Sequence, residues 1–393
     1  MNIRQLVRIG AVCATLVVAA CGGGGGGIGG TGAPEGTLRL GLTDAPACGY
    51  DAVNITVERV RVHQGAGAAD GDSGWSEIVL SPPRRVDLLS LSNGVIEELG
   101  QTALPAGRYT QLRLVLAPNG SVAPFANSVF PSGGAETALS TPSAQQSGLK
   151  LNVNIDVAAN QVADFVLDFD ACRSIVKAGN SGRYNLKPVI SVIPRISDAG
   201  LRVVGHVDPS MGNGATGVSL QLDGSVVKAT APDASGRFVL YPVPVGTYAL
   251  VVTSADRATA VMTGVPVVTT AHTFVSTQSL PIAPPARVAA LRTVSGSVIP
   301  TTAEVRALQQ VGATPQVEVA WAAVDSDSGA FTMQLPIEAP VSVAYVVNPV
   351  ALPFVADNAS AARYTIEAKA GTATKRVGID ASAPVPAISF TFP

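Results

Sequence analysis

The sequence predicts an all-β protein of tandem β-sandwich domains with few short helices. After residue 35, apolar and polar residues alternate with a period of two over most of the chain, as they do in half-buried strands. Turns rich in Gly, Pro, Asn and Asp separate these segments, and the chain holds 40 Gly and 28 Pro. Its 393 residues exceed one ordinary domain, so two or three domains are expected.

The N-terminus has the layout of a secretory signal peptide. Arg4 and Arg8 precede an uncharged apolar stretch from Ile9 to Ala20, and no acidic residue interrupts them. This stretch is shorter than the roughly 20 residues that a membrane-spanning helix needs. Residues 1–20 are therefore predicted to be a signal peptide.

The signal peptide ends in Val18-Ala19-Ala20-Cys21, which resembles the lipobox of bacterial lipoproteins. The resemblance implies that the Cys21 thiol is lipidated, becomes the N-terminus of the mature chain and anchors it to a membrane. Gly22 resembles an outer-membrane sorting signal, because Asp at that place favours inner-membrane retention. The expected location is the cell envelope, at the outer membrane, facing the periplasm or the cell surface. An ordinary signal peptide with a chance cysteine is the alternative.

Residues 21–35 are predicted to be the lipidated cysteine and a flexible Gly-rich tether, because they hold almost nothing to bury.

The charge of the mature chain is close to balanced. Without the two arginines of the signal peptide, it has 24 basic and 28 acidic side chains, a net charge of −4. A nucleic-acid partner is not expected, since such proteins normally show a basic patch. The expected partner is the membrane, through Cys21; a protein or glycan ligand stays open.

The cysteine count predicts one disulfide. Of the four cysteines, Cys13 leaves with the signal peptide and Cys21 is lipidated, so Cys48 and Cys172 remain. In an oxidising compartment such a pair is expected to form a bridge. Two separately buried thiols are the alternative.

Residues 36–197 are expected to form the first β domain. Residues 149–157 alternate strictly and predict a strand, while the alternation that starts at Val53 changes phase near Glu58 and Arg59, which predicts a β-bulge. Further strands are predicted at Thr37–Leu42, Trp75–Leu80, Tyr109–Leu116, Ala163–Phe169 and Leu186–Ile193. Short helices are predicted around Ser90–Leu99 and Thr301–Gln310.

Two further domains of similar design are expected at residues 199–281 and 287–393. The segment 201–207 resembles 291–298, and Gly236-Arg237-Phe238 resembles Gly329-Ala330-Phe331, at nearly the same spacing. The Pro-rich residues 281–285 are predicted to link the two domains stiffly.

The first domain resembles a bacterial family known as domain of unknown function 4382 (DUF4382). The resemblance runs from about Gly36 to Ile196 and rests on four separated blocks, Gly41–Pro46, Leu104–Tyr109, Leu167–Asp170 and Tyr184–Ile190. It implies an exported β domain and no particular activity.

The second domain, from about Gly200 to Leu280, resembles the transthyretin-like domains found beside carboxypeptidases and in surface proteins. The pattern is Asp233-x-x-Gly236-x-Phe238-x-Leu240, followed by Val243-Pro244-x-Gly246-x-Tyr248. The resemblance implies sandwiches of the immunoglobulin or transthyretin type that act as structural or adhesive spacers. The third domain keeps Gly329 and Phe331 but has Ala339-Pro340 at the second turn, so a divergent copy is expected.

No residue pattern predicts catalysis. His63, His206 and His272 lie far apart in the sequence, without Cys or acidic residues at zinc-ligand spacing. Neither a Gly-x-Ser-x-Gly elbow nor a phosphate loop occurs. The chain is therefore expected not to be an enzyme and to need no cofactor.

One acidic group remains a candidate metal site. A Cys48–Cys172 bridge would bring together the carboxylates near both cysteines, those of Asp44, Asp51, Asp168 and Asp170. Four carboxylates at one rim suit calcium, whose ligands are oxygens. Solvated turn residues are the alternative, with Asp44 capping a local turn.

The predicted function is that of a non-catalytic envelope lipoprotein with a binding, adhesive or structural role. One alternative is a carbohydrate-binding or polysaccharide-processing accessory protein, which would need an exposed aromatic platform. Trp75 and Trp321 are the only tryptophans, and both lie in strand-like contexts that suit a core. A surface module stabilised by calcium is the second alternative.

Overall fold

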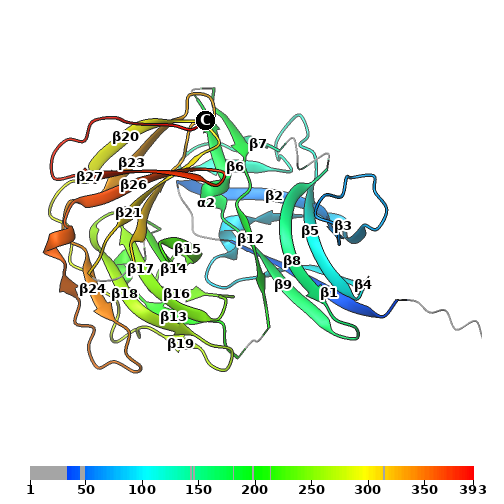
Figure 1. Ribbon diagram of the computed structural model, residues 1–393, viewed down its shortest axis with the longest axis horizontal. Helices are drawn as coiled ribbons and strands as arrows, with labels where there is room; N and C mark the ends of the chain where they lie inside the picture. Colours follow the sequence, from blue (N-terminus) through cyan, green and yellow to red (C-terminus); the bar gives the residue numbers. More distant parts are fainter. Residues whose placement is uncertain are drawn as a thin grey trace, which may run out of the picture. The chain divides into compact units, whose positions relative to one another are not determined.

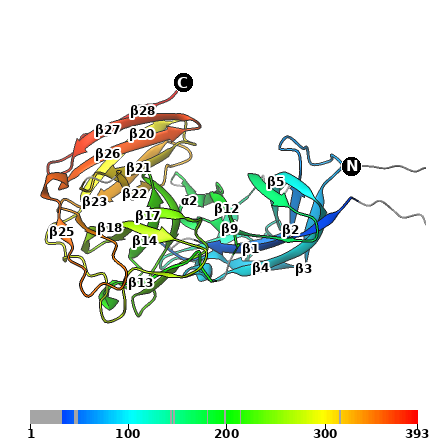
Figure 2. The ribbon, with the colours of Figure 1, turned by 60° about the horizontal axis from the view of Figure 1, so that its bottom comes forward.

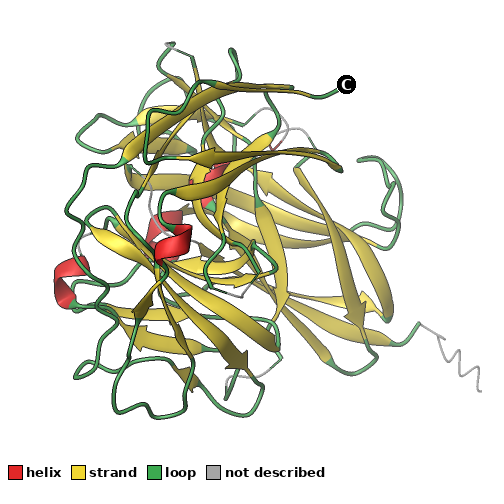
Figure 3. Cartoon of the chain, turned by 60° about the vertical axis from the view of Figure 1, so that its left-hand side comes forward, coloured by secondary structure: helices red, strands yellow, loops and turns green. Residues whose placement is uncertain are grey.

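The computed structural model describes residues 33–44, 49–141, 144, 147–179, 181–196, 199–212, 214–312 and 315–393. Strands dominate them, as Figure 3 shows. The helices with described bounds are one turn of α-helix, α2 (Ala171–Ser174), and three 3-10 turns, η1 (Leu88–Leu91), η2 (Pro209–Met211) and η3 (Asn358–Ser360). The all-β prediction is confirmed. No helix in this part of the chain is long and apolar enough to cross a membrane.

The first part of the chain forms two sheets around one apolar core (Figure 1). The smaller sheet has the order β12-β9-β1-β4, made of β12 (Ile190–Pro194), β9 (Val162–Phe169), β1 (Glu35–Asp44) and β4 (Glu97–Pro105). The larger sheet has the order β10-β11-β7-β6-β2-β5-β8, with β3 also paired to β2. Its strands are β2 (Tyr50–His63), β3 (Ser76–Asp87), β5 (Gly107–Leu116), β6 (Ser128–Pro131), β7 (Thr137–Ser140), β8 (Leu149–Val157), β10 (Ile175–Ala178) and β11 (Arg183–Leu186).

The strongest strand patterns are confirmed. Strand β8 covers the predicted residues 149–157, with Leu149 and Ile155 buried and Lys150 exposed. The register of β2 shifts between Val57 and Arg59, which is the predicted bulge. The strand predicted at residues 186–193 is interrupted, because β11 ends before and β12 begins after Pro188, a residue without an N–H for the ladder.

Both helix predictions are wrong. Within residues 90–99 only the end of η1 is helical; Asn93 and Gly94 then take positive φ angles of 57° and 77°, and β4 begins at Glu97. Residues 304–309 form strand β21 instead of a helix, because β21 is paired on both sides within its sheet. Tertiary pairing overrides the weak local helix preference in both segments.

The rest of the chain contains two sandwiches with the same strand order. The first joins sheet β16-β13-β19 to β15-β14-β17-β18, and the second joins β23-β20-β28 to β22-β21-β26-β27. Figure 2 shows the second of them with β26 and β27 side by side. The bounds are β13 (Val203–His206), β14 (Thr216–Leu222), β15 (Ser225–Thr230), β16 (Arg237–Leu240), β17 (Gly246–Ser254), β18 (Arg257–Val267), β19 (Thr273–Phe274), β20 (Arg292–Ile299), β21 (Glu304–Gln309), β22 (Val317–Ala322), β23 (Ala330–Leu335), β26 (Arg363–Ala370), β27 (Ala373–Asp380) and β28 (Ile388–Thr391).

Equivalent residues of the sequence repeat occupy equivalent places. Gly205 lies opposite Phe238 on the neighbouring strand, and Gly296 lies opposite Phe331. A Cβ at Gly205 would come within 2.4 Å of the Phe238 ring, and one at Gly296 within 2.6 Å of the Phe331 ring. Each glycine therefore makes room for a core phenylalanine.

Two short strands from the last sandwich extend a sheet of the preceding sandwich. The segment between β23 and β26 forms β24 (Val341–Ala344), which runs parallel to β18, and β25 (Val355–Ala356), which pairs with β24 (Figure 1). Val341 joins the core of the preceding sandwich. Contacts accordingly group Pro34–Pro393 into one compact unit.

Candidate functional site

The predicted anchor and half of the predicted bridge fall outside the described residues, because these exclude Cys21 and Cys48. Cys172 lies in α2. Asp44, four residues before Cys48, accepts a hydrogen bond from the backbone N–H of Ala171 at 2.9 Å. Asp44, the last described residue before Cys48, therefore lies beside α2, and the bridge itself stays a prediction.

Asp44 is a buried carboxyl group, and one of its two oxygens makes no hydrogen bond in the described part of the chain. Its side chain is 1% exposed, and Oδ2 has no hydrogen-bond partner within the described residues. Burial raises the pKa of Asp44 well above its usual value; the N–H of Ala171 and the ammonium of Lys228 counteract this rise, while the charges of Asp170 and Asp168 add to it. Its surroundings therefore disfavour ionisation of Asp44 relative to an exposed aspartate.

Two of the four aspartates predicted to bind calcium, Asp168 and Asp170, are held in ion pairs. Asp168 accepts from the buried ammonium of Lys228. Asp170 caps α2 and pairs with Arg173 at 3.2 Å. Asp51 is exposed and accepts from the backbone N–H of Gly133 at 3.1 Å. In the described part of the chain, no group of three or more His, Cys, Asp or Glu side chains is arranged to hold a metal ion. Lys228 and Arg173, which the predicted set did not include, supply positive charge to Asp168 and Asp170.

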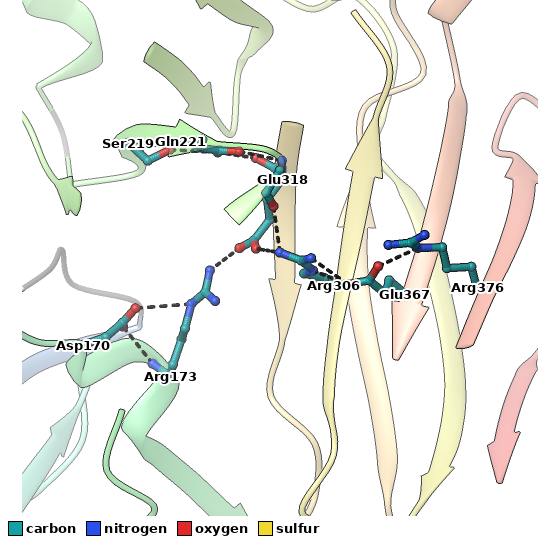
Figure 4. A network of polar contacts seen from close by, with 9 residues as sticks. Asp170, Arg173, Ser219, Gln221, Arg306, Glu318, Glu367 and Arg376 are labelled. Atoms are coloured by element: carbon teal, nitrogen blue, oxygen red, sulfur yellow. Dashed lines mark hydrogen bonds and ion pairs between the residues drawn. The ribbon is translucent and has the colours of Figure 1, made fainter. Parts of the chain in front are cut away.

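From Asp170, a chain of ion pairs crosses the junction of the three sandwiches (Figure 4). We call it the junction network; its members are Asp170, Arg173, Glu318, Arg306, Glu367 and Arg376. Arg173 donates to Glu318, which lies 3.3 Å from Arg306, and Arg306 reaches Glu367 at 2.6 Å. The first and third sandwiches are thereby tied together.

The second sandwich joins the network through the backbone of Glu318. The Gln221 side-chain amide donates to the carbonyl of Glu318 at 2.8 Å and accepts from its N–H at 2.7 Å. Burial raises the pKa of Glu318, although Arg173 and Arg306 lower it. The pKa of Glu367 is lowered, because Arg376 and Arg306 together outweigh the effect of burial.

Next to the junction network, two small cavities border Trp321; together we call them the Trp321 cleft. One measures about 110 Å³ and lies between the first and third sandwiches. The other measures about 180 Å³ and also touches Ser225 and Val226 of the second sandwich. Arg173, Glu304 and Trp321 line both cavities. Binding sites often form at such domain junctions.

Three polar groups of the residues that line the cleft make no hydrogen bond in the described part of the chain. The indole N–H of Trp321 is buried without a hydrogen-bond partner in the described residues. The side chains of Asn185 and Glu304, which both line the first cavity, likewise make no hydrogen bond or ion pair there. Buried polar groups are normally paired, so the orphaned N–H of Trp321 is unusual, but its nitrogen has almost no accessible surface.

Sequence reasoning assigned Trp321 to a core, and the structure places it half-buried at the junction. Trp321 lies opposite Arg306 in register, and Glu318 also contacts Arg306. Residues three apart would face opposite sides of a regular strand. The register shift between Ala307 and Leu308 brings them to the same side, and no sequence signal marks it.

Trp75 is also half-buried and lies outside the apolar core of the first sandwich, although a core position was predicted. The guanidinium groups of Arg61 and Arg113 each lie 4.6 Å from its ring, and its N–H donates to the carbonyl of Ala69 at 2.9 Å. Trp75 therefore has no free polar edge, in contrast to Trp321.

Comparison with known proteins identifies one part of the chain. No curated protein matches it. Two solved structures of a type II cohesin–X-dockerin complex from Acetivibrio cellulolyticus, a C-terminal and an N-terminal interface mutant, share 26% and 25% identity over 21% of this chain, with TM-scores of 0.19 and 0.18. The match spans 56% of those chains, and the TM-scores are too low to establish a shared fold. Residues 35–188 match the family model described as a domain of unknown function (DUF4382), in agreement with the resemblance of its sequence blocks.

Proposed function

We propose that this chain is a lipid-anchored, non-catalytic binding protein of the bacterial envelope, with the Trp321 cleft as its ligand site. The observation that carries the proposal is the cleft itself, a cavity at the meeting point of three sandwiches with unpaired polar groups in its wall. The arginines nearby are held in ion pairs, which suits a fixed recognition surface.

The anchor is proposed from the sequence Val18-Ala19-Ala20-Cys21. The 13 residues from Gly22 to Pro34 separate Cys21 from β1. Fully extended, they would reach about 45 Å, because each residue spans at most about 3.5 Å. Such a tether would let the sandwiches stand clear of an outer-membrane surface.

The two later sandwiches are proposed to be transthyretin-like spacers. Their shared strand order supports this, as does the turn in which Gly236 takes a φ of +82° ahead of the core residue Phe238. The proposed Cys48–Cys172 disulfide would close the first sandwich in the oxidising envelope.

Metabolic labelling tests the anchor. Cells that produce the wild-type chain and the variant Cys21→Ala receive radioactive palmitate, and Cys13→Ala serves as the matched control because Cys13 lies inside the predicted signal peptide. We expect labelled, membrane-bound protein from the wild type and from Cys13→Ala, and unlabelled protein from Cys21→Ala. Equal labelling of Cys21→Ala would exclude the anchor.

A carbohydrate-binding accessory role is the second candidate. Trp321 favours it, because a half-buried tryptophan that lines two cavities offers an apolar ring to a sugar.

A further inference from the structure

We infer that a second pocket, beside the segment that runs from β24 to β25, binds the acyl chain of a membrane lipid. We call it the β24–β25 pocket; it measures about 460 Å³. It shares no lining residue with the Trp321 cleft, so this inference goes beyond the proposed function.

Separate parts of the chain form the β24–β25 pocket. Met262 of β18 and Val311, just after β21, line it and are both buried. Val343 of β24 and Leu352 add further wall, and both pack against the core of the second sandwich. The pocket is therefore built on side chains that the surrounding sheets hold in place.

The wall of the pocket offers no charge to a ligand. Among the residues that the structure describes, those that line it are all uncharged, and Thr263 and Ser342 supply its polar side chains. The carbonyl of Thr263 already accepts from the N–H of Tyr345 at 2.8 Å, and the N–H of Gly312 donates to Asp357 at 2.7 Å. An apolar ligand loses least on entering such a pocket, since it leaves no polar group without a partner.

Filling the pocket would cover apolar side chains that are now exposed. Val346 and Val355 line it and are 60% and 67% exposed. They belong to a stretch, residues 339–356, that contains no charged residue. Exposed apolar side chains gathered on one surface are typical of a binding site.

The volume suits one long chain. About 460 Å³ falls within the roughly 300–1,000 Å³ of ligand-binding pockets. At about 30 Å³ for each non-hydrogen atom, the share of a water molecule in the liquid, the pocket holds about 15 carbon atoms. The acyl chain of a membrane lipid is of this size. The choice of a membrane lipid as its source rests on the proposed anchor, which would place a bilayer beside the protein.

Displacement of a fluorescent probe tests the pocket. N-phenyl-1-naphthylamine is uncharged and emits more strongly in apolar surroundings. The full-length Cys21→Ala chain is used without detergent, so that neither a lipid on Cys21 nor a detergent competes for the pocket. The bound probe is displaced with hexanol, octanol and decanol, which differ in chain length, with octanoate, which carries a charge, and with monodecanoylglycerol, which carries a lipid head group.

Two variants in this chain change the pocket itself. Val346→Asp places a carboxylate in its wall, and Ala344→Phe fills part of it with a ring. Val347→Asp is the matched control, because Val347 adjoins Val346 and is 68% exposed but does not line the pocket. Circular dichroism and the melting temperature verify that each variant is folded, and sedimentation gives its oligomeric state.

We expect saturable probe binding, displaced up to about 4-fold more tightly for each further CH₂ of the alcohol that enters the pocket. Octanol and octanoate should bind about equally, and monodecanoylglycerol like decanol, because the wall holds no charge that recognises a head group. Val346→Asp should weaken binding about 10-fold, the effect of one or two lost CH₂ contacts. Ala344→Phe should abolish binding, and Val347→Asp should bind like the parent chain.

Three results would overturn the inference. Equal binding by folded Val346→Asp and Val347→Asp would place the probe elsewhere on the chain. An affinity that follows the head group instead of the chain length would refute an acyl-chain ligand. A dimer that dissociates in Val346→Asp would show that a second copy of the chain covers the pocket. Palmitate labelling tests the anchor separately, so the anchor and the pocket can each fail alone.

Discussion

At the scale of single residues, the same side-chain contact recurs in two sandwiches. Tyr109 donates its hydroxyl hydrogen bond to the carbonyl of Pro105 at 3.0 Å, and Tyr248 donates to Pro244 at 2.8 Å. Both tyrosines end a Pro-x-Gly-x-Tyr segment that opens a strand. This short motif is legible in the sequence because the donor and the acceptor are only four residues apart.

Asp44 predicts a stability that depends on pH. Because the pKa of Asp44 is raised in the folded state, its contribution to stability is complete below the pKa of the unfolded chain and is lost as pH rises through the folded value. Asp44→Asn stays neutral and keeps an oxygen for the N–H of Ala171. We expect the variant to gain stability relative to the wild type between pH 4 and pH 7, measured by urea denaturation.

The control for Asp44→Asn is Asp51→Asn, whose carboxylate is exposed. Its stability difference from the wild type should stay nearly constant over the same range. A constant difference for Asp44→Asn as well would show that Asp44 is already ionised in the folded protein.

At the scale of elements, pairing with neighbouring strands determines the secondary structure of segments whose local sequence pattern is ambiguous. Residues 304–309 form β21 because β22 and β26 pair with both of its edges, although a helix was predicted there. Turns that contain a glycine are easier to predict from the sequence. Gly236 and Gly329 take φ angles of +82° and +70° in the turns that precede β16 and β23.

The turn before β16 gives a test at this scale. A Cβ at Gly236 would lie 2.2 Å from the carbonyl oxygen of Val207, whereas one at Gly264, at a φ of +73°, would meet nothing within 4 Å. Gly264→Ala should therefore cost only the roughly 1 kcal/mol of a left-handed backbone. Gly236→Ala should cost at least about twice as much in thermal denaturation, because the backbone must also move. Equal losses would show that this close approach is absent.

At the scale of the whole molecule, the junction network and the β24–β25 excursion join sandwiches that could otherwise act as separate modules. Glu318 is central, because it accepts from Arg173 and Arg306 while its backbone bonds to Gln221. Removing one member of a buried ion pair is costly, since the partner charges remain desolvated. The junction should therefore fix the shape of the Trp321 cleft.

Glu318→Gln tests this role. Without the carboxylate, two guanidinium groups lose a buried counter-ion, and we expect a loss of roughly 3 kcal/mol in the free energy of unfolding. Arg376→Gln at the exposed end of the network is the control, with a side chain that is 63% exposed and an expected loss below about 1 kcal/mol. Similar small losses for both variants, measured by denaturant titration, would mean that the network does not stabilise the junction.

The sequence by itself determined the all-β class, the DUF4382 segment, the bulge of β2 and the glycine turns, because each depends on residues close together in the chain or on a regular period. Tertiary structure alone decided that Lys228 pairs with Asp168, one of the aspartates expected to bind calcium, and that Arg173 reaches Glu318. It also decided that a register shift turns Trp321 and Glu318 to one side, beside a cavity. These contacts join residues up to 145 positions apart in the sequence, and a local pattern does not predict which distant side chains will be in contact.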